Sequence, residues 1–275
     1  MNERELAELK ETARQIRILI VRMISRAASG HPGGSLSAVE ILAFLYFREM
    51  RLDPRDPSLP DRDRFVLSKG HAAPVLYAAL ARRGFFPVDA LDTLRQASSP
   101  LQGHPHRLDT PGVEASTGSL GQGLSMACGM ALGLRLSASP ARVYALIGDG
   151  ESQEGQIWEA AMTAGFRKLS NLCVFLDYND LQIDGRVSEI KDIRPLRGKW
   201  QAFGWRVEEI DGHDLTQIAA ALDAFHGEAE RPTLVIARTV KGKGVSFMEN
   251  NVAFHGKAPD ARETAQALAE LGHGA

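Results

Sequence analysis

Apolar side chains recur every three or four positions over residues 3–28, and this spacing places them on one face of an α-helix. The segment Gly-His-Pro-Gly-Gly at residues 30–34 ends this helix, and a second helix is predicted over residues 35–50. A connection rich in Pro and Asp follows at residues 53–63. We therefore expect a helical segment over about residues 3–50 that packs on the rest of the chain.

The remainder of the chain alternates short apolar strands with helices. Strands are predicted at residues 65–67, 142–147, 172–177, 206–210 and 233–240. Helices are predicted at residues 72–83, 124–136, 156–166, 196–203, 215–225 and 262–271, with an aperiodic loop at residues 98–119. Several strands are apolar without interruption, which is typical of parallel strands covered on both faces. We therefore predict an α/β fold with a parallel sheet flanked by helices, in a single domain over residues 1–275.

Composition narrows the function classes. The chain has 275 residues, of which 44% are hydrophobic and 24% charged, and this mix argues against disordered and collagen-like proteins. Because 32 Lys and Arg face 34 Asp and Glu, the net charge of −2 predicts no binding to nucleic acid or to a membrane surface. Apolar runs are far shorter than the roughly 20 residues of a membrane span. Cys128 and Cys173 lack the spacing of a disulfide framework or zinc site, so we expect an unprocessed cytoplasmic protein.

The segment Gly148-Asp149-Gly150 lies where an apolar strand ends and a helix is about to begin. Ligands of open α/β sheets collect at the carboxyl ends of strands. There Gly150 would let the backbone approach a ligand closely, the next helix would offer N–H groups to a phosphate, and Asp149 would hold a cation. An ordinary tight turn explains Gly-Asp-Gly equally well on its own.

A second polar segment, Asp177-Tyr178-Asn179-Asp180-Leu181, follows the next apolar strand. It could therefore lie beside the first segment at the same edge of the sheet. A carboxylate, an amide oxygen and a backbone carbonyl from two strand ends suit Mg²⁺ or Ca²⁺, which prefer oxygen ligands and share them with phosphates.

Together the two segments resemble the thiamine diphosphate motif, in which Asp and Asn bind the metal that anchors the diphosphate. Four histidines make the resemblance more specific: His31 in Gly-His-Pro-Gly-Gly-Ser, His71 in Ser-Lys-Gly-His, His104 in Gln-Gly-His-Pro and His255 in Phe-His-Gly. These segments, and Thr-Gly-Ser-Leu-Gly-Gln-Gly at residues 117–123, resemble transketolases. The resemblance extends over about residues 6–259.

The resemblance implies a thiamine diphosphate-binding fold, with thiamine diphosphate and Mg²⁺ (or Ca²⁺ or Mn²⁺) as cofactors. It implies metal ligation by Asp149, Asn179 and the carbonyl of Leu181. The cofactor-binding residues that it implies are His71, Gly118, Ser119, Leu120, Gly148, Gly150, Asn179 and His255. The catalytic residues would be His31, His104 and His255, because imidazole moves protons near neutral pH, whereas the carbon chemistry belongs to the cofactor.

Other polar residues leave two interpretations open. Glu154 and Glu159 match positions where transketolases place acidic residues between two active sites, but a helix N-terminus and an exposed helix face explain them equally well. The Lys241-Gly242-Lys243-Gly244 segment either contacts phosphate or forms an ordinary basic turn. His106 and His213 have no counterpart in the family's site, so we expect them to be structural or solvated.

A complete transketolase also has a second α/β domain over the cofactor's aminopyrimidine, and a third domain. Since about twenty residues follow His255, the resemblance implies the N-terminal subunit of a split transketolase. A separate C-terminal subunit with the pyrimidine-binding and third domains would complete the site, in an α2β2 heteromer. Such an enzyme transfers a two-carbon ketol unit from a ketose phosphate to an aldose phosphate.

Several alternatives share part of this pattern. The α subunit of a 2-oxo acid dehydrogenase also has the Gly-Asp-Gly to Asn spacing, but the His-containing segments favour a transketolase. A deoxyxylulose phosphate synthase is normally one long chain. A noncatalytic phosphate-binding module is disfavoured by the retained Asp149 and Asn179. The glycine spacing at residues 118–123 does not match the dinucleotide-binding fingerprint.

Overall fold

The computed structural model describes residues 1–272, and at its centre lies a parallel sheet. Within these residues the sheet has five strands in the order β1-β2-β3-β7-β6. The strands are β1 (Arg64–Leu67), β2 (Val143–Gly148), β3 (Leu172–Tyr178), β6 (Arg206–Asp211) and β7 (Thr233–Arg238). All four pairings are parallel, so the strands end at one common edge. The predicted α/β class is confirmed.

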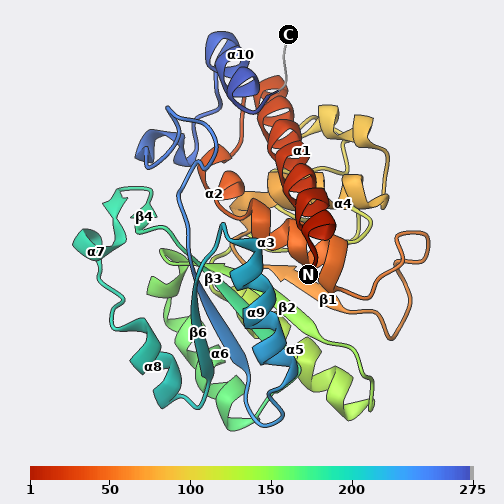
Figure 1. The fold of residues 1–275 in the computed structure, drawn as a ribbon, viewed down its shortest axis with the longest axis vertical. Helices are drawn as coiled ribbons and strands as arrows, with labels where there is room; N and C mark the ends of the chain where they lie inside the picture. Colours follow the sequence, from red (N-terminus) through yellow and green to blue (C-terminus); the bar gives the residue numbers. More distant parts are fainter. Residues whose placement is uncertain (273–275) are drawn as a thin grey trace.

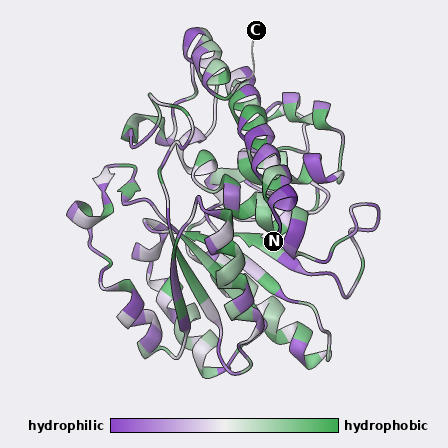
Figure 2. Cartoon of the chain, viewed as in Figure 1, coloured by the Kyte–Doolittle hydropathy of each residue, from purple (hydrophilic) through white to green (hydrophobic). Residues whose placement is uncertain are grey.

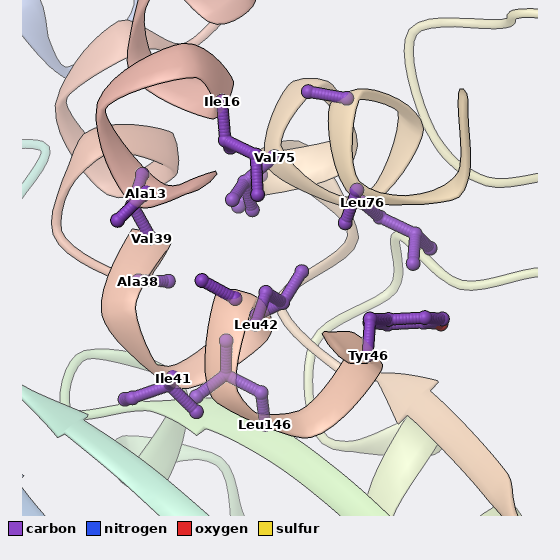
Figure 3. Close-up of a cluster of buried hydrophobic side chains, with 14 of the residues drawn as sticks. Ala13, Ile16, Ala38, Val39, Ile41, Leu42, Tyr46, Val75, Leu76 and Leu146 are labelled. Carbon is purple, nitrogen blue, oxygen red and sulfur yellow. The ribbon is translucent and has the colours of Figure 1, made fainter. Parts of the chain in front are cut away.

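Helices cover both faces of the sheet because alternate strand residues are apolar on each side (Figure 1). In β2, Tyr144 and Leu146 join one apolar cluster, whereas Ala145 and Ile147 join the other. The first cluster contains residues of α1 (Glu3–Ala27), α3 (Val39–Phe44), α4 (Ala73–Arg83) and α9 (Leu215–His226). The second contains residues of α5 (Gln122–Leu136), α6 (Gly155–Phe166) and α8 (Leu196–Ala202). Figure 3 shows Leu146 facing Ile41 and Leu42 in the first cluster.

The N-terminal helical segment packs on the face of the sheet that carries Tyr144 and Leu146. Helix α1 begins at a capping box made by Asn2 and Glu5, and it packs against α3, α4 and the last helix, α10 (Ala261–Glu270). The prediction of one helix over residues 35–50 is wrong. The chain instead forms α2 (Pro32–Leu36), α3 and a π-helical turn over Leu45–Glu49. At the break between α2 and α3, the Ser37 hydroxyl bonds to the carbonyl of Gly34 and to Asp177 of the sheet.

Smaller elements follow strand ends and loops. The strands β4 (Leu181–Gln182) and β5 (Gly185–Arg186) form a short hairpin before α7 (Val187–Ile190), and neither was predicted. Short 3-10 helices lie at Gly70–Ala72, Val88–Thr93, Glu151–Gln153 and Val252–His255. Residues 98–119 are irregular, as predicted. Strand β7 ends two residues before its predicted end, because the Val240 amide bonds to a side chain of the neighbouring turn and not to another strand.

Hydrophobic residues are concentrated in the strands and on the inner faces of the helices (Figure 2). Among residues 1–272, none of the helices combines the length and apolar character needed to cross a membrane.

Candidate active site

A cavity of about 410 Å³ opens at the common carboxyl edge of β1, β2 and β3. The chain turns away from the sheet there, and the loops after three strands surround one space. Most of the residues proposed from the sequence line this cavity: His31, His71, His104, Gly118, Leu120, Gly148, Asp149, Gly150, Asn179, Leu181 and His255. Ser119 is exposed and lies outside the lining that residues 1–272 provide. Segments separated by more than 200 residues thus meet at one place.

Asp149 connects the ends of β2 and β3. One carboxyl oxygen accepts hydrogen bonds from the amides of Asn179 (2.9 Å) and Asp180 (2.6 Å), and the other accepts one from Gly150 (2.7 Å). The carboxyl group is buried. Burial, with the nearby charge of Asp177, raises the pKa of Asp149 to about 7. A buried carboxyl group held this way gains stability from a cation beside it.

The oxygen atoms around Asp149 are of the kind that bind a hard cation. The Asn179 side-chain oxygen accepts from the Leu181 amide at 3.2 Å, which turns the chain so that the Leu181 carbonyl also faces the cavity region. That carbonyl accepts from the Lys241 ammonium at 2.7 Å, so a cation already lies beside this oxygen. Within residues 1–272 no cluster of three or more His, Cys, Asp or Glu forms a metal site. The oxygens available are the Asp149 carboxylate, the Asn179 amide and the Leu181 carbonyl. This set fits a Mg²⁺ that takes further oxygens from a phosphate.

Four imidazole rings line the same cavity and lie close to one another. The centroid of His31 lies 5.4 Å from His71, 6.2 Å from His104 and 5.6 Å from His255, and His71 stacks on His255 at 5.2 Å. Burial is the main cause that lowers all four pKa values. Nearby cations contribute, and the pKa falls to about 4 for His31 and about 3 for His255. All four rings are therefore neutral at pH 7 and can accept or donate a hydrogen bond.

Two buried lysines supply positive charge to the same cavity. Lys69 forms an ion pair with Asp177 and donates to the Gly34 carbonyl at 2.7 Å. Burial alone would raise the pKa of Asp177, but Lys69 and two hydroxyl donors bring it below its usual value. Lys241 lies 2.9 Å from Nδ1 of His255, and burial lowers its pKa to about 8. Neutral imidazoles and ammonium groups are suitable donors for the oxygens of a diphosphate.

The glycines at this edge leave room for such a ligand. A Cβ added at Gly150 would lie 3.1 Å from the Gln182 Cβ, inside the cavity lining. Gly118 has a φ of +153° and its added Cβ would lie 3.0 Å from the His104 ring. A side chain at either position would crowd the space that the backbone leaves open.

Comparison with known proteins identifies the family. The thiamine diphosphate-binding domain of transketolase matches residues 9–275. The chain belongs to the transketolase family. It is 48% identical over 271 residues to a 6-deoxy-6-sulfo-D-fructose transketolase subunit from Clostridium sp. (strain MSTE9), covering 98% of each chain. It is 44% identical to an apulose-4-phosphate transketolase subunit from Actinobacillus succinogenes, covering 96% of each.

Longer transketolases align with the chain over less than half of their length. Human transketolase is 41% identical, and the match covers 98% of this chain and 43% of the human protein. The crystal structure of transketolase from Campylobacter jejuni superposes with a TM-score of 0.93 at 33% identity, covering 100% of this chain and 44% of that one. The family membership decides against a 2-oxo acid dehydrogenase subunit.

Sequence reasoning missed three charged residues of this transketolase-family site. Lys69, Glu151 and Asp177 line the cavity but were given no role. Glu151 accepts hydrogen bonds from the Ser68 hydroxyl and from the amides of Gly121 (2.9 Å) and Gly148 (3.0 Å). Burial raises its pKa. The available signal was position, since each residue lies within three residues of the end of a buried strand.

The remaining polar residues lie in the cavity, at the surface and in the interior. Glu154 lines the cavity, and Glu159 is exposed on α6. His106 pairs with Asp109 at 2.7 Å near the surface. His213 is buried in a network below the site, so the structural alternative fits it better than the solvated one.

Proposed function

We propose that the chain is the thiamine diphosphate-binding subunit of a two-chain transketolase, which transfers a two-carbon ketol unit between sugars. The observation that carries this proposal is the meeting of Asp149, Asn179 and the Leu181 carbonyl with four neutral imidazoles in one cavity. Its support from relatives is that two chains of matching length are described as transketolase subunits.

Mg²⁺ would bind to Asp149, the Asn179 side-chain oxygen and the Leu181 carbonyl. The diphosphate would complete its coordination and accept hydrogen bonds from His71, His255 and the backbone near Gly150. Lys241 would also contact the diphosphate, because its ammonium lies beside His255 and the Leu181 carbonyl. The loop at Gly118, Ser119 and Leu120 would pass beside the rest of the cofactor, where the Gly118 backbone leaves space.

Three of the histidines, His31, His104 and His255, would line the substrate channel and handle protons of the sugar. Bound thiamine diphosphate supplies the carbon nucleophile that breaks and remakes the carbon–carbon bond. His31, His104 and His255 are neutral, because burial lowers their pKa values. A neutral imidazole has a free ring nitrogen that accepts a hydrogen bond from a sugar hydroxyl and fixes its orientation. The negative charge of a bound diphosphate would raise the pKa of the ring toward the range in which it takes and returns a proton.

A second chain would complete the active site and bind the anionic end of the sugar. We place a further contact, between two copies of this chain, on a surface formed by α5 and α6. This α5–α6 face exposes Met126 (40%), Leu136 (81%), Met162 (54%) and Phe166 (79%). Large exposed apolar side chains gathered on neighbouring helices are typical of interfaces. Glu159 lies one helical turn before Met162 on this face, while Glu154 lies in the cavity, so both could connect two sites in an α2β2 assembly.

Titration calorimetry tests the cofactor assignment. With a C-terminal transketolase subunit added, the chain is expected to bind thiamine diphosphate only when Mg²⁺ is present, and Asp149→Ala should abolish this binding at cofactor concentrations that saturate the wild type. The matched control is Asp109→Ala, which removes a surface carboxylate paired with His106. Equal binding by Asp149→Ala would overturn the metal assignment, and equal failure of wild type and variant would support a noncatalytic module.

Reconstitution tests the activity and the partner. The chain should transfer ketol groups only after addition of a C-terminal transketolase subunit, and sedimentation should then show two copies of each chain. The donor panel comprises xylulose 5-phosphate, fructose 6-phosphate, and the sugars in the names of the two relatives. A normal rate from this chain alone would refute the two-chain proposal. The cytoplasm remains our proposed location, and within the described residues both cysteines are buried free thiols that suit a reducing compartment.

A further inference from the structure

His213 connects two segments that lie far apart in the sequence. It occupies the turn after β6, and its ring lies between Glu40 of α3 and the backbone of Val240, just after β7. Nδ1 is 2.9 Å from a carboxyl oxygen of Glu40, and Nε2 is 2.9 Å from the Val240 amide nitrogen. The His213 side chain is 13% exposed and that of Glu40 is 11% exposed, so water competes little with either bond.

These two contacts define the protonation of the ring. A backbone amide only donates, so Nε2 of His213 must be the unprotonated acceptor. The hydrogen of the ring is therefore on Nδ1, which donates a hydrogen bond to the Glu40 carboxylate. Although burial raises the pKa of Glu40, hydrogen bonds from His213 and Arg17 and the charge of Arg17 bring it down to about 2. The carboxylate is thus ionised and keeps the imidazole in the form that accepts from Val240.

Arg17 connects Lys243, in the loop at residues 239–244, to the same carboxylate of Glu40. Its guanidinium contacts both oxygens of Glu40, at 2.6 and 2.7 Å, and its Nε donates to the Lys243 carbonyl at 3.0 Å. Val240 and Lys243 flank Lys241, whose ammonium reaches the Leu181 carbonyl and His255. Glu40 is therefore the common anchor of the residues on either side of this lysine.

We propose that His213, oriented by Glu40, is a positioning residue that directs Lys241 into the cofactor cavity. It acts by fixing the backbone at Val240, one residue before the lysine. This inference rests on the proposed function, since it takes the cavity to be a diphosphate site. Gly242 also donates to the Gly33 carbonyl at 3.0 Å, so loss of the His213 contact would loosen the loop without releasing it.

Two substitutions of His213, by Asn and by Gln, each keep only one of the two hydrogen bonds of the ring, to Glu40 or to Val240. The amide group of His213→Asn can replace Nδ1 and donate to Glu40, but it is too short to reach Val240. The oxygen of His213→Gln can replace Nε2 and accept from Val240. We expect His213→Asn to weaken binding of Mg²⁺–thiamine diphosphate to the full chain with its partner subunit about tenfold, the effect of one hydrogen bond. His213→Gln should stay within about threefold of wild type.

Two further measurements distinguish positioning from a general loss of structure. In a Lys241→Met background, His213→Asn should cause no further loss of affinity, whereas independent effects would multiply. Hydrogen exchange in residues 239–244 should quicken in His213→Asn but not in His213→Gln. His226→Asn is the matched control, because His226 also pairs with a glutamate, Glu49 at 2.7 Å, in a different contact. It should leave cofactor affinity unchanged.

The outcomes are distinct. If the wild type binds cofactor and His213→Asn binds equally well, or if the two substitutions act independently, the positioning role is refuted and the proposed function stands. If the wild type does not bind even with the partner subunit present, the proposed function fails and this inference fails with it. Should His213→Asn not fold, replacing Val240 with the matching hydroxy acid removes only the amide donor. The same tenfold loss is then expected, and wild-type affinity would refute the role.

Discussion

Gly123 lies where α5 packs against the end of β1, directly under the cavity. A Cβ added at this position would lie 2.5 Å from the Ser68 Cα and 2.6 Å from its hydroxyl oxygen. The contact with backbone cannot be relieved by rotating a side chain. Ser68 donates to Glu151, which in turn holds the amides of Gly121 and Gly148. Gly123→Ala should therefore displace α5 and disturb the loops at the cavity edge together.

The size of the effect follows from two opposing contributions. Replacing Gly by Ala inside a helix favours folding by about 1 kcal/mol. Overpacking costs typically about 1–3 kcal/mol, and a contact as short as 2.5 Å with backbone belongs at or above the upper end of this range. We expect the free energy of unfolding to fall by about 2 kcal/mol. In a chain of this size the melting temperature should fall by about 4–8 °C.

Gly129→Ala provides the matched control on the same helix. An added Cβ there has no atom of the described residues within 4 Å, so only the helix propensity remains. Calorimetric melting of the full chain without its partner should show Gly129→Ala stabilised by about 1 kcal/mol and Gly123→Ala destabilised. Equal or higher melting temperature for Gly123→Ala would show that α5 is not packed on β1 as described.

Three further changes test other parts of the molecule. Glu151→Gln leaves one acceptor oxygen for three donors, so urea titration should show a loss of about 1–3 kcal/mol, and an unchanged midpoint would contradict the described contacts. Leu146→Ala, in the centre of the sheet, should cost about 2–5 kcal/mol in the same assay; a loss below about 1 kcal/mol would show that this position is not closely packed. Lowering the pH from 6.5 to 4 should cost the cofactor-free chain the stability that His31 and His255 contribute, while the raised pKa of Asp149 acts in the opposite direction. The folded pKa values of about 4 for His31 and about 3 for His255 lie below the ordinary 6.5, so the unfolded chain binds more protons in this window. Compared with the wild type, the variant with Asn at both positions should lose less stability over this pH range, and an unaltered slope would contradict the neutral state of the two rings.

Sequence patterns predicted the sheet well, because the apolar pattern within each strand is enough to indicate a buried strand. Strand residues such as Tyr144 and Ala145 alternate between two apolar clusters, so β2 must be covered on both faces whatever the rest of the chain does. The end of β2 and the end of β3 then meet at one edge, since the strands are parallel neighbours. The meeting of Asp149 with Asn179 follows from that register, and this is why the oxygen ligands could be proposed from sequence.

The helical segment after residue 34 was predicted less well, because its conformation depends on contacts with residues far away in the sequence. Residues 35–50 have good helical spacing, yet Ser37 bonds to Asp177, 140 residues away. That contact lies at the break between α2 and α3, and Gly34 of α2 lines the cavity. Local propensity cannot report such a contact, and the helix is broken where the site needs close backbone packing.

The charged residues behind the cavity show the same limit. Lys69 follows a buried strand in the segment that supplied His71, but its partner Asp177 is 108 residues away. His213 lies 173 residues from Glu40. A buried charge is tolerated only where a partner and hydrogen bonds compensate it. The sequence therefore predicts groups that would face a ligand, through glycine and histidine in loops, more readily than groups that hold those loops in place, whose partners are known only once the chain is folded.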